Sequence, residues 1–165
     1  MVRTRIEDAR GFFRNARRIA VVGVSRDVKG FSRYVFRELL QRGLDAVPVN
    51  PALGEVAGVR AVARVQDLEP LPDSVILMLP PERAEQVVRD CLVARVKRLW
   101  FHRGAGGPGA ASPAALALCA ANRIEVVQGL CPLMALPETA FPHRLHALVR
   151  CATAHPAHLC APAAR

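Results

Sequence analysis

Short apolar runs recur along most of the chain, and amphipathic segments separate them. A run of about four to eight apolar residues between polar or turn-forming residues is typical of a β-strand buried on both faces. We predict such strands at residues 19–24, 44–49, 74–79, 98–101 and 124–127. Between them, apolar residues recur at steps of three and four, the spacing of one helix face. We predict helices over residues 6–15, 32–43, 81–96 and 113–122.

Strands that alternate with helices favour a parallel sheet with helices on both faces. The chain is therefore expected to fold as an α/β, doubly wound parallel sheet of about five strands in three layers. Ser32 suits the N-cap of the second helix, and Gly43 suits its C-terminal cap. Residues 53–72 interrupt the alternation, and we expect a loop there with a short strand at about Ala61–Val62 and a helical turn near 65–68.

The alternation is complete before residue 136, so residues 1–136 are predicted to form one domain. Residues 137–165 are expected to form a C-terminal extension, with a helix near 143–151 and then a flexible tail. The extension contains Cys151, His155, His158 and Cys160, residue types that bind zinc. The two cysteines lack the close spacing of structural zinc sites, so we predict no metal site.

The composition is that of an ordinary globular protein. Of 165 residues, 52% are hydrophobic and 22% are charged, unlike a disordered chain. No apolar run approaches the ~20 residues that span a bilayer, and no apolar block follows the charged N-terminus as in a secretory signal. We therefore expect a cytoplasmic protein without a membrane partner, whose five cysteines are reduced thiols.

The formal net charge is +9, and most of it lies near the N-terminus. Residues 1–45 carry 11 basic and 5 acidic side chains, whereas residues 46–100 carry seven of each. Such a bias favours a small polyanionic ligand. Nucleic acid, an acidic surface and a merely solvated arginine-rich face are the alternatives.

The clearest candidate site lies in this basic region. The apolar run from Ile19 breaks at Gly23, a polar loop with Gly30 follows, and the second predicted helix then begins. The first turn of a helix leaves N–H groups unpaired and its dipole attracts anions, so this order of elements builds a phosphate site. The next strand ends at Asn50-Pro51, without the acidic residue that holds the ribose of NAD. We therefore expect a nucleotide other than NAD.

Five stretches together resemble the stand-alone CoA-binding domain proteins, which are small relatives of the N-terminal domain of the succinyl-CoA synthetase alpha subunit. The stretches are IAVVGVS (19–25), VPVNP (47–51), the apolar strand running into PPE (80–82), LWFH (99–102) and GLCP (129–132). They follow the family's order, although the family often has glutamine at the position of His102.

The resemblance implies a Rossmann-like fold that binds coenzyme A or an acyl-CoA. Around the pyrophosphate it implies Gly23, Val24, Ser25, Arg26, Lys29, Phe31 and Ser32, with Arg33 as a further source of positive charge. Asn50 and Pro51 would hold the adenosine half of the ligand. An apolar wall and the lining beside it would come from Leu79, Pro80, Pro81, His102 and Arg103.

Three cysteines precede the extension. Cys131 follows the last predicted strand, where the sulfur of the pantetheine arm would approach. Its thiol is either a site for a mixed disulfide with CoA or a buried small residue. Cys91 and Cys119 lie on apolar helix faces and are expected to pack in the core.

These observations favour a CoA-binding carrier, sensor or accessory subunit without catalysis of its own. Neither Asp73 nor Glu82 makes an obvious acid–base pair, and we predict no catalytic residue. The alternatives are an NAD(P)-dependent oxidoreductase and the CoA-binding part of a split acyl-CoA ligase. Nucleic acid is disfavoured, because too few residues precede the first strand for a winged-helix domain. A homo-oligomer or a protein partner stays open.

Overall fold

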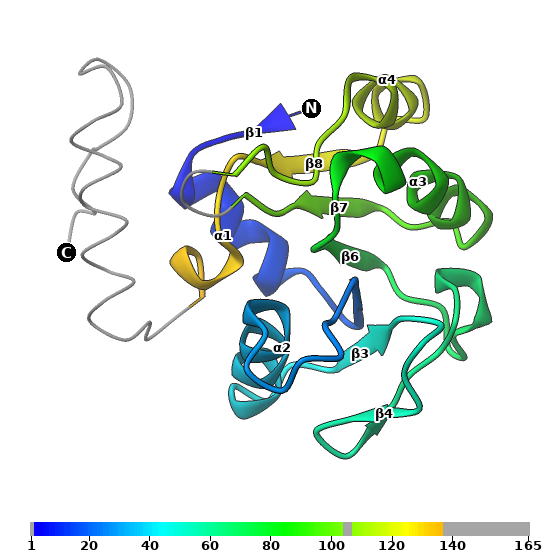
Figure 1. The fold of residues 1–165 in the computed structure, drawn as a ribbon. Helices are drawn as coiled ribbons and strands as arrows, with labels where there is room; N and C mark the ends of the chain where they lie inside the picture. The colour runs from blue at the N-terminus through cyan, green and yellow to red at the C-terminus, as the bar shows by residue number, and fades with distance from the viewer. Residues whose placement is uncertain (1, 104–106, 137–165) are drawn as a thin grey trace, which may run out of the picture.

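Six parallel strands form the main sheet of the computed structural model, which describes residues 2–103 and 107–136 (Figure 1). The strands are β1 (Val2–Arg3), β2 (Ile19–Val22), β3 (Ala46–Val49), β6 (Ser74–Leu77), β7 (Arg98–Phe101) and β8 (Glu125–Gln128). Their order across the sheet is β1-β8-β7-β6-β2-β3. All five predicted strands are present, and the fold is the expected α/β parallel sheet. The sixth strand is β1, which was not predicted and pairs with β8.

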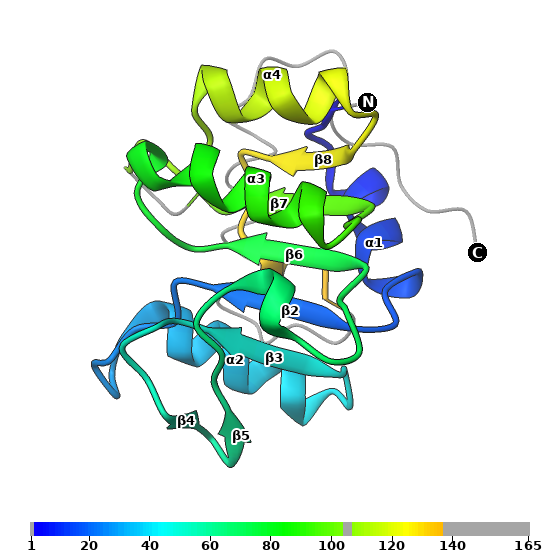
Figure 2. The same ribbon diagram turned by 90° about the vertical axis from the view of Figure 1, so that its right-hand side faces the viewer.

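Helices cover both faces of the sheet and give the molecule three layers (Figure 2). On one face lie α1 (Ile6–Arg14) and α2 (Phe31–Gln41), and on the other lie α3 (Ala84–Val93) and α4 (Pro113–Ala121). The sequence predicted each of these helices, with ends that differ by a few residues.

Residues of the strands alternate between the two faces. In β2, Ile19 and Val21 join the core beneath α1 and α2, whereas Ala20 and Val22 join the core beneath α3 and α4. All four residues are buried, because the strand is covered on both sides. The continuous apolar runs in the sequence are therefore the signature of this three-layer arrangement.

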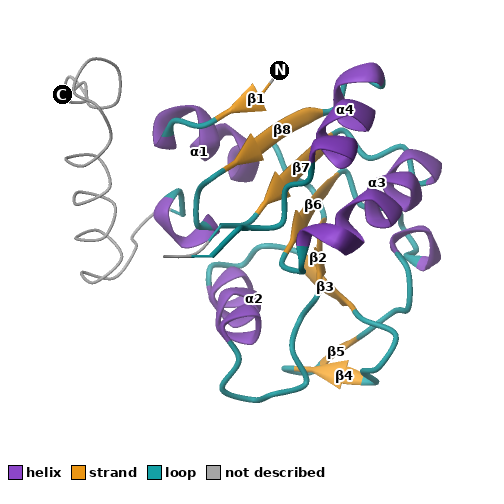
Figure 3. Ribbon diagram, turned by 45° about the horizontal axis from the view of Figure 1, so that its top comes forward, coloured by secondary structure: helices purple, strands orange, loops and turns teal. Residues whose placement is uncertain are grey.

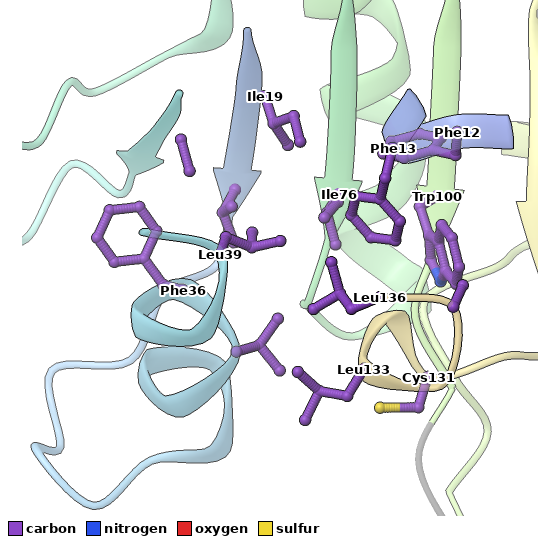
Figure 4. Packing of buried hydrophobic residues seen from close by; sticks show 14 of the residues in the cluster. Phe12, Phe13, Ile19, Phe36, Leu39, Ile76, Trp100, Cys131, Leu133 and Leu136 are labelled. Carbon is purple, nitrogen blue, oxygen red and sulfur yellow. The ribbon is translucent and has the colours of Figure 1, made fainter. Parts of the chain in front are cut away.

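The core beneath α1 is aromatic (Figure 4). The ring centres of Phe12 and Phe13 lie 5.3 and 5.4 Å from that of Trp100. Trp100 is fully buried, and its indole N–H donates to the carbonyl of Leu130 at 2.9 Å. Truncating such a side chain to alanine typically costs about 3–5 kcal/mol, so this cluster anchors β7 to α1.

The connections change direction at β2. From β2 the chain passes through α2 to β3 on one side, and then crosses to β6 on the other side. Figure 3 shows β2 and β6 side by side between α2 and α3. The carboxyl ends of these two strands border the switch point, where open α/β sheets bind their ligands.

The segment that crosses from β3 to β6 contains a small hairpin. Its strands are β4 (Glu55–Val56) and β5 (Val59–Arg60), and η1 (Val65–Asp67) follows as the expected helical turn. The strand predicted at 61–62 is wrong, since Val62 makes only an isolated bridge to Val49. The positive φ angles of residues 57 and 58 close a two-residue turn and put the pairing earlier in the chain.

Candidate functional site

Gly23 follows β2 directly and lies against the backbone that follows β6, at Met78 and Leu79. Its φ is +89°, and a Cβ there would lie 2.9 Å from the carbonyl carbon of Met78 and 3.2 Å from Cβ of Leu79. Its N–H donates to the carbonyl of Val49 at 3.1 Å. Only glycine fits this conformation and this space. The residue therefore allows three neighbouring strand ends to meet at the switch point.

The loop that follows is ordered by its own hydrogen bonds. The N–H of Ser25 donates to Oγ of Ser32 at 2.8 Å, and the N–H of Asp27 donates to Oγ of Ser25 at 3.0 Å. The N–H of Lys29 donates to Oδ1 of Asp27 at 2.9 Å. At Gly30, a Cβ would lie 2.6 Å from Cβ of Ser25, so the loop closes tightly on itself.

Helix α2 begins without a side-chain cap. Gly30 is its N-cap and Phe31 its first residue, so the predicted Ser32 cap is wrong. The hydroxyl of Ser32 instead accepts from Ser25 in the preceding loop. The first turn contains no acidic residue either. Within the described residues, the N–H groups of Phe31 and Ser32 have no acceptor and are available to an external anion, whereas that of Arg33 donates to the carbonyl of Gly30 at 3.0 Å. The helix dipole also favours an anion there.

Three basic residues surround this helix start. Arg26 and Lys29 are exposed on the loop after β2. Arg33 is half-buried, and its Nε is buried without a hydrogen-bond partner among the residues that the structure describes. Across the switch point, the first turns of η2 (Pro81–Arg83) and α3 instead carry Glu82 and Glu85. The α2 side of the switch point is therefore the side that attracts an anion.

Asn50 connects the end of β3 to the loop after β2. Its Nδ2 donates to the carbonyl of Val24 at 2.7 Å, and its Oδ1 accepts from the N–H of Ala52 at 2.9 Å. Val24 is fully buried, whereas Pro51 is exposed. The Asn50 side chain thus positions the loop, and the strand ends without a carboxylate that would repel a phosphate.

Leu79, Pro80 and Pro81 follow β6 at the switch point. Leu79 and Pro81 are half-buried and Pro80 is exposed, so they present apolar surface at the carboxyl edge. Pro81 is the first residue of η2, the position predicted for it.

His102 follows β7, and its ring lies against Phe31. The ring centres are 5.5 Å apart and the ring planes are inclined by 31°. The backbone N–H of His102 donates to the carbonyl of Leu77 at 3.0 Å. Burial lowers the pKa of His102 to about 4, so the imidazole is neutral at pH 7.

The three cysteines that the structure describes are buried. Cys131 is 7% exposed and packs in the core beneath α2, beside η3 (Pro132–Met134), as Figure 4 shows. Its reaction with CoA stays a prediction. Cys91 and Cys119 are fully buried core residues, as predicted. Burial raises the pKa of Cys119 to about 11 and that of Cys91 further still.

Tyr34 is a neighbour of the candidate site that was not predicted from the sequence. Its ring centre lies 6.4 Å from that of Phe31, and burial, followed by the nearby Glu38, raises its pKa. The spacing of three residues puts Phe31 and Tyr34 on one helix face, which was the available signal.

Within residues 2–103 and 107–136, no group of three or more His, Cys, Asp or Glu side chains could hold a metal ion. No helix in the same part of the chain is long and apolar enough to cross a membrane. The predicted extension, with Cys151, His155, His158 and Cys160, lies outside the described residues.

Two curated proteins resemble this chain in sequence. It is 35% identical over 81 residues to the Pyrococcus furiosus acetate–CoA ligase (ADP-forming) II subunit alpha, a match that covers 48% of this chain and 18% of that subunit. It is 29% identical over 89 residues to the uncharacterised Bacillus subtilis protein YneT, which covers 54% of this chain and 66% of that protein. The chain thus spans less than two thirds of the length of either relative.

Structural and family comparisons agree with these matches. A solved structure from Thermus thermophilus, cell-free ID.343, superposes with a TM-score of 0.67 at 29% identity, covering 78% of this chain and 93% of that one. The family model described as a CoA binding domain matches residues 17–137. The glycine-ended β2, the uncapped α2 and the switch point all lie within the matched residues, and the chain belongs to the CoA-binding domain family.

Proposed function

We propose that this protein binds coenzyme A or an acyl-CoA at the carboxyl edge of the sheet, beside the start of α2. The uncapped first turn of that helix, flanked by Arg26, Lys29 and Arg33, carries the proposal. CoA contains a pyrophosphate and a ribose 3′-phosphate, and therefore needs several N–H donors and cations. Membership of the CoA-binding domain family supports the same ligand.

The residues divide between the parts of the ligand. The N–H groups of Phe31 and Ser32 would donate to the pyrophosphate, because the N–H of Ser25 is already bound within the loop. Asn50 and Pro51 would lie beside the adenosine half, with no carboxylate to repel the 3′-phosphate. Leu79, Pro80 and Pro81 would contact the ligand through their apolar surfaces.

In this proposal the chain performs no reaction alone and serves as a cytoplasmic carrier, sensor or accessory subunit. Asp73 is paired with Arg98 at 2.8 Å and lies at the amino end of β6, the edge opposite to the site. Glu82 is exposed in η2, and within residues 2–103 and 107–136 no hydrogen bond or ion pair joins it to a second titratable side chain as in a catalytic pair. The described part of the site therefore offers binding groups rather than a proton-transfer system.

Calorimetric titration with CoA, dephospho-CoA and NAD tests the proposal. CoA is expected to bind more tightly than dephospho-CoA, because the 3′-phosphate adds a charged contact with basic side chains. NAD is expected to bind far more weakly than either. Equal affinities for NAD and CoA would contradict the proposal.

A second candidate is the CoA-binding part of a split acyl-CoA ligase. It is favoured by the 35% identity to a ligase subunit, of which the matched part makes up 18%. The purified chain would then form no acyl-CoA from an acid, ATP and CoA, and would regain activity with a partner chain. Turnover by the chain alone would contradict both this role and the non-catalytic one.

A further inference from the structure

His102 occupies a specific place at the carboxyl edge. It is two residues after Trp100, so strand alternation directs it to the face covered by α1 and α2. The hydrogen bond from the backbone N–H of His102 to the carbonyl of Leu77 connects it to the end of β6. On its other side the ring contacts Phe31, the first residue of α2. His102 therefore borders the site from the side of β7.

One ring nitrogen of His102 lacks a partner. Nδ1 is buried, and no hydrogen-bonding group in residues 2–103 and 107–136 reaches it. A buried nitrogen of this kind is usually paired in native proteins. Burial alone lowers the pKa of the ring to about 4, which leaves a neutral imidazole at pH 7. A neutral imidazole forms one hydrogen bond as donor and one as acceptor, and it suits an amide better than a phosphate.

The order of strands decides which part of CoA would reach this nitrogen. The adenosine half is assigned to the end of β3, and the pyrophosphate to the start of α2 after β2. β7 lies two strands beyond β2 in the opposite direction, about 10 Å away at the usual strand spacing. A ligand that crosses the strand ends in this direction meets β6 and β7 with its pantetheine arm, which contains two amide groups.

We propose that His102 is a specificity-determining residue that hydrogen-bonds through Nδ1 to an amide of the pantetheine arm, with Phe31 holding its ring in place. The proposal rests on the proposed binding of CoA and adds the part of the ligand that is recognised. It makes the pantetheine arm, and not only the nucleotide, a source of affinity.

The test compares His102→Phe with His102→Gln, using CoA and adenosine 3′,5′-bisphosphate as ligands. The bisphosphate contains the adenosine and two phosphates but lacks the pantetheine arm. His102→Phe keeps a ring against Phe31 and removes the nitrogen. We expect it to weaken CoA binding about tenfold and to leave bisphosphate binding unchanged. His102→Gln keeps a hydrogen-bonding group and is expected to retain most of the CoA affinity.

A measurement on the unaltered protein covers the case in which His102→Phe fails to fold. The ¹⁵N resonances of the His102 ring, assigned with His102→Gln, should shift when CoA is added and stay in place when the bisphosphate is added. Equal weakening of both ligands, no weakening of either, or equal ¹⁵N shifts would overturn the proposal. Failure of the unaltered protein to bind CoA would instead overturn the proposed function.

Discussion

Helices α2 and α4 both begin near the carboxyl edge of the sheet, and they begin differently. Helix α4 is capped by Ser112, whose Oγ accepts from the N–H of Ala115 at 3.2 Å, and Pro113 is its first residue. Helix α2 begins at Phe31 after the N-cap Gly30 and has no side-chain cap, although Ser32 lies in its first turn. A serine cap typically adds about 1 kcal/mol of stability, which α2 does without.

The two helix starts differ in whether their free N–H groups need hydrogen-bond acceptors from outside the chain. At α4 the chain supplies the hydroxyl of Ser112 as an acceptor for the N–H of Ala115. Its first residue, Pro113, has no N–H and therefore needs no acceptor. At α2 the hydroxyl of Ser32 accepts from the N–H of Ser25 and so orders the loop, while the N–H groups of Phe31 and Ser32 are left to solvent or to an anion. A capped start therefore serves stability, whereas the open start is suited to binding.

The largest expected effect comes from the strand end that leads into the open start. Gly23→Ala would force a side chain into positive φ and against the backbone of Met78, so we expect a loss of about 3 kcal/mol or more in unfolding free energy. Gly54→Ala is the control, because no atom lies within 4 Å of a Cβ there. Urea denaturation measures both, and similar stabilities would contradict the packing described at the switch point.

A pH dependence should follow from His102 beside the open start. Its folded pKa of about 4 lies below the usual value of about 6.5 in an unfolded chain, so between these values the unfolded chain binds more protons. The contribution of the neutral His102 to the unfolding free energy is therefore fully present above about pH 6.5 and is lost as pH falls toward 4. By pH 4.5 the loss should be about 2.5 kcal/mol. His102→Gln should remove this part of the acid sensitivity. If the variant lost as much unfolding free energy between pH 7 and pH 4.5 as the unaltered protein, His102 would not be its source.

Charge at the open start should affect binding more than folding. Lys29→Ala or Arg26→Ala should weaken CoA binding by about 1–3 kcal/mol and barely change the melting temperature. Lys97→Ala is the matched control, because this exposed lysine precedes β7 at the opposite edge of the sheet. Calorimetry in low and high salt measures the effect. If both loop variants bound CoA like the unaltered protein, backbone N–H groups alone would hold the phosphates.

The smallest expected effect separates the two serines. Ser112→Ala should lower the unfolding free energy by about 1 kcal/mol through loss of the α4 cap, with CoA affinity unchanged. Ser32→Ala removes the acceptor for the N–H of Ser25 and should reduce CoA affinity more than stability. Thermal melts and CoA titrations on both variants measure this contrast. The same pattern for the two serines would mean that they play equivalent roles.

Local patterns were sufficient for most of the fold. The five predicted strands and four helices are present because each carries its own apolar periodicity, and the alternation of these elements specifies a parallel three-layer sheet. β1 escaped prediction because Val2–Arg3 is too short to show a period and is a strand only by pairing with β8. The hairpin at 55–60 escaped because its turn contains Ala57 and Gly58 rather than a strong turn pair.

The sequence by itself determined the order of the five predicted strands and four helices, the glycine after β2, the basic region around α2 and the family resemblance. All of these are properties of residues close together in the chain. Only the tertiary structure decided that Ser32 serves the loop and not the helix, and that Gly23 meets the backbone of Met78. It also decided that Phe31 and His102 share a contact. These outcomes depend on hydrogen bonds and packing between residues that folding brings together, and such contacts leave no periodic signal along the chain.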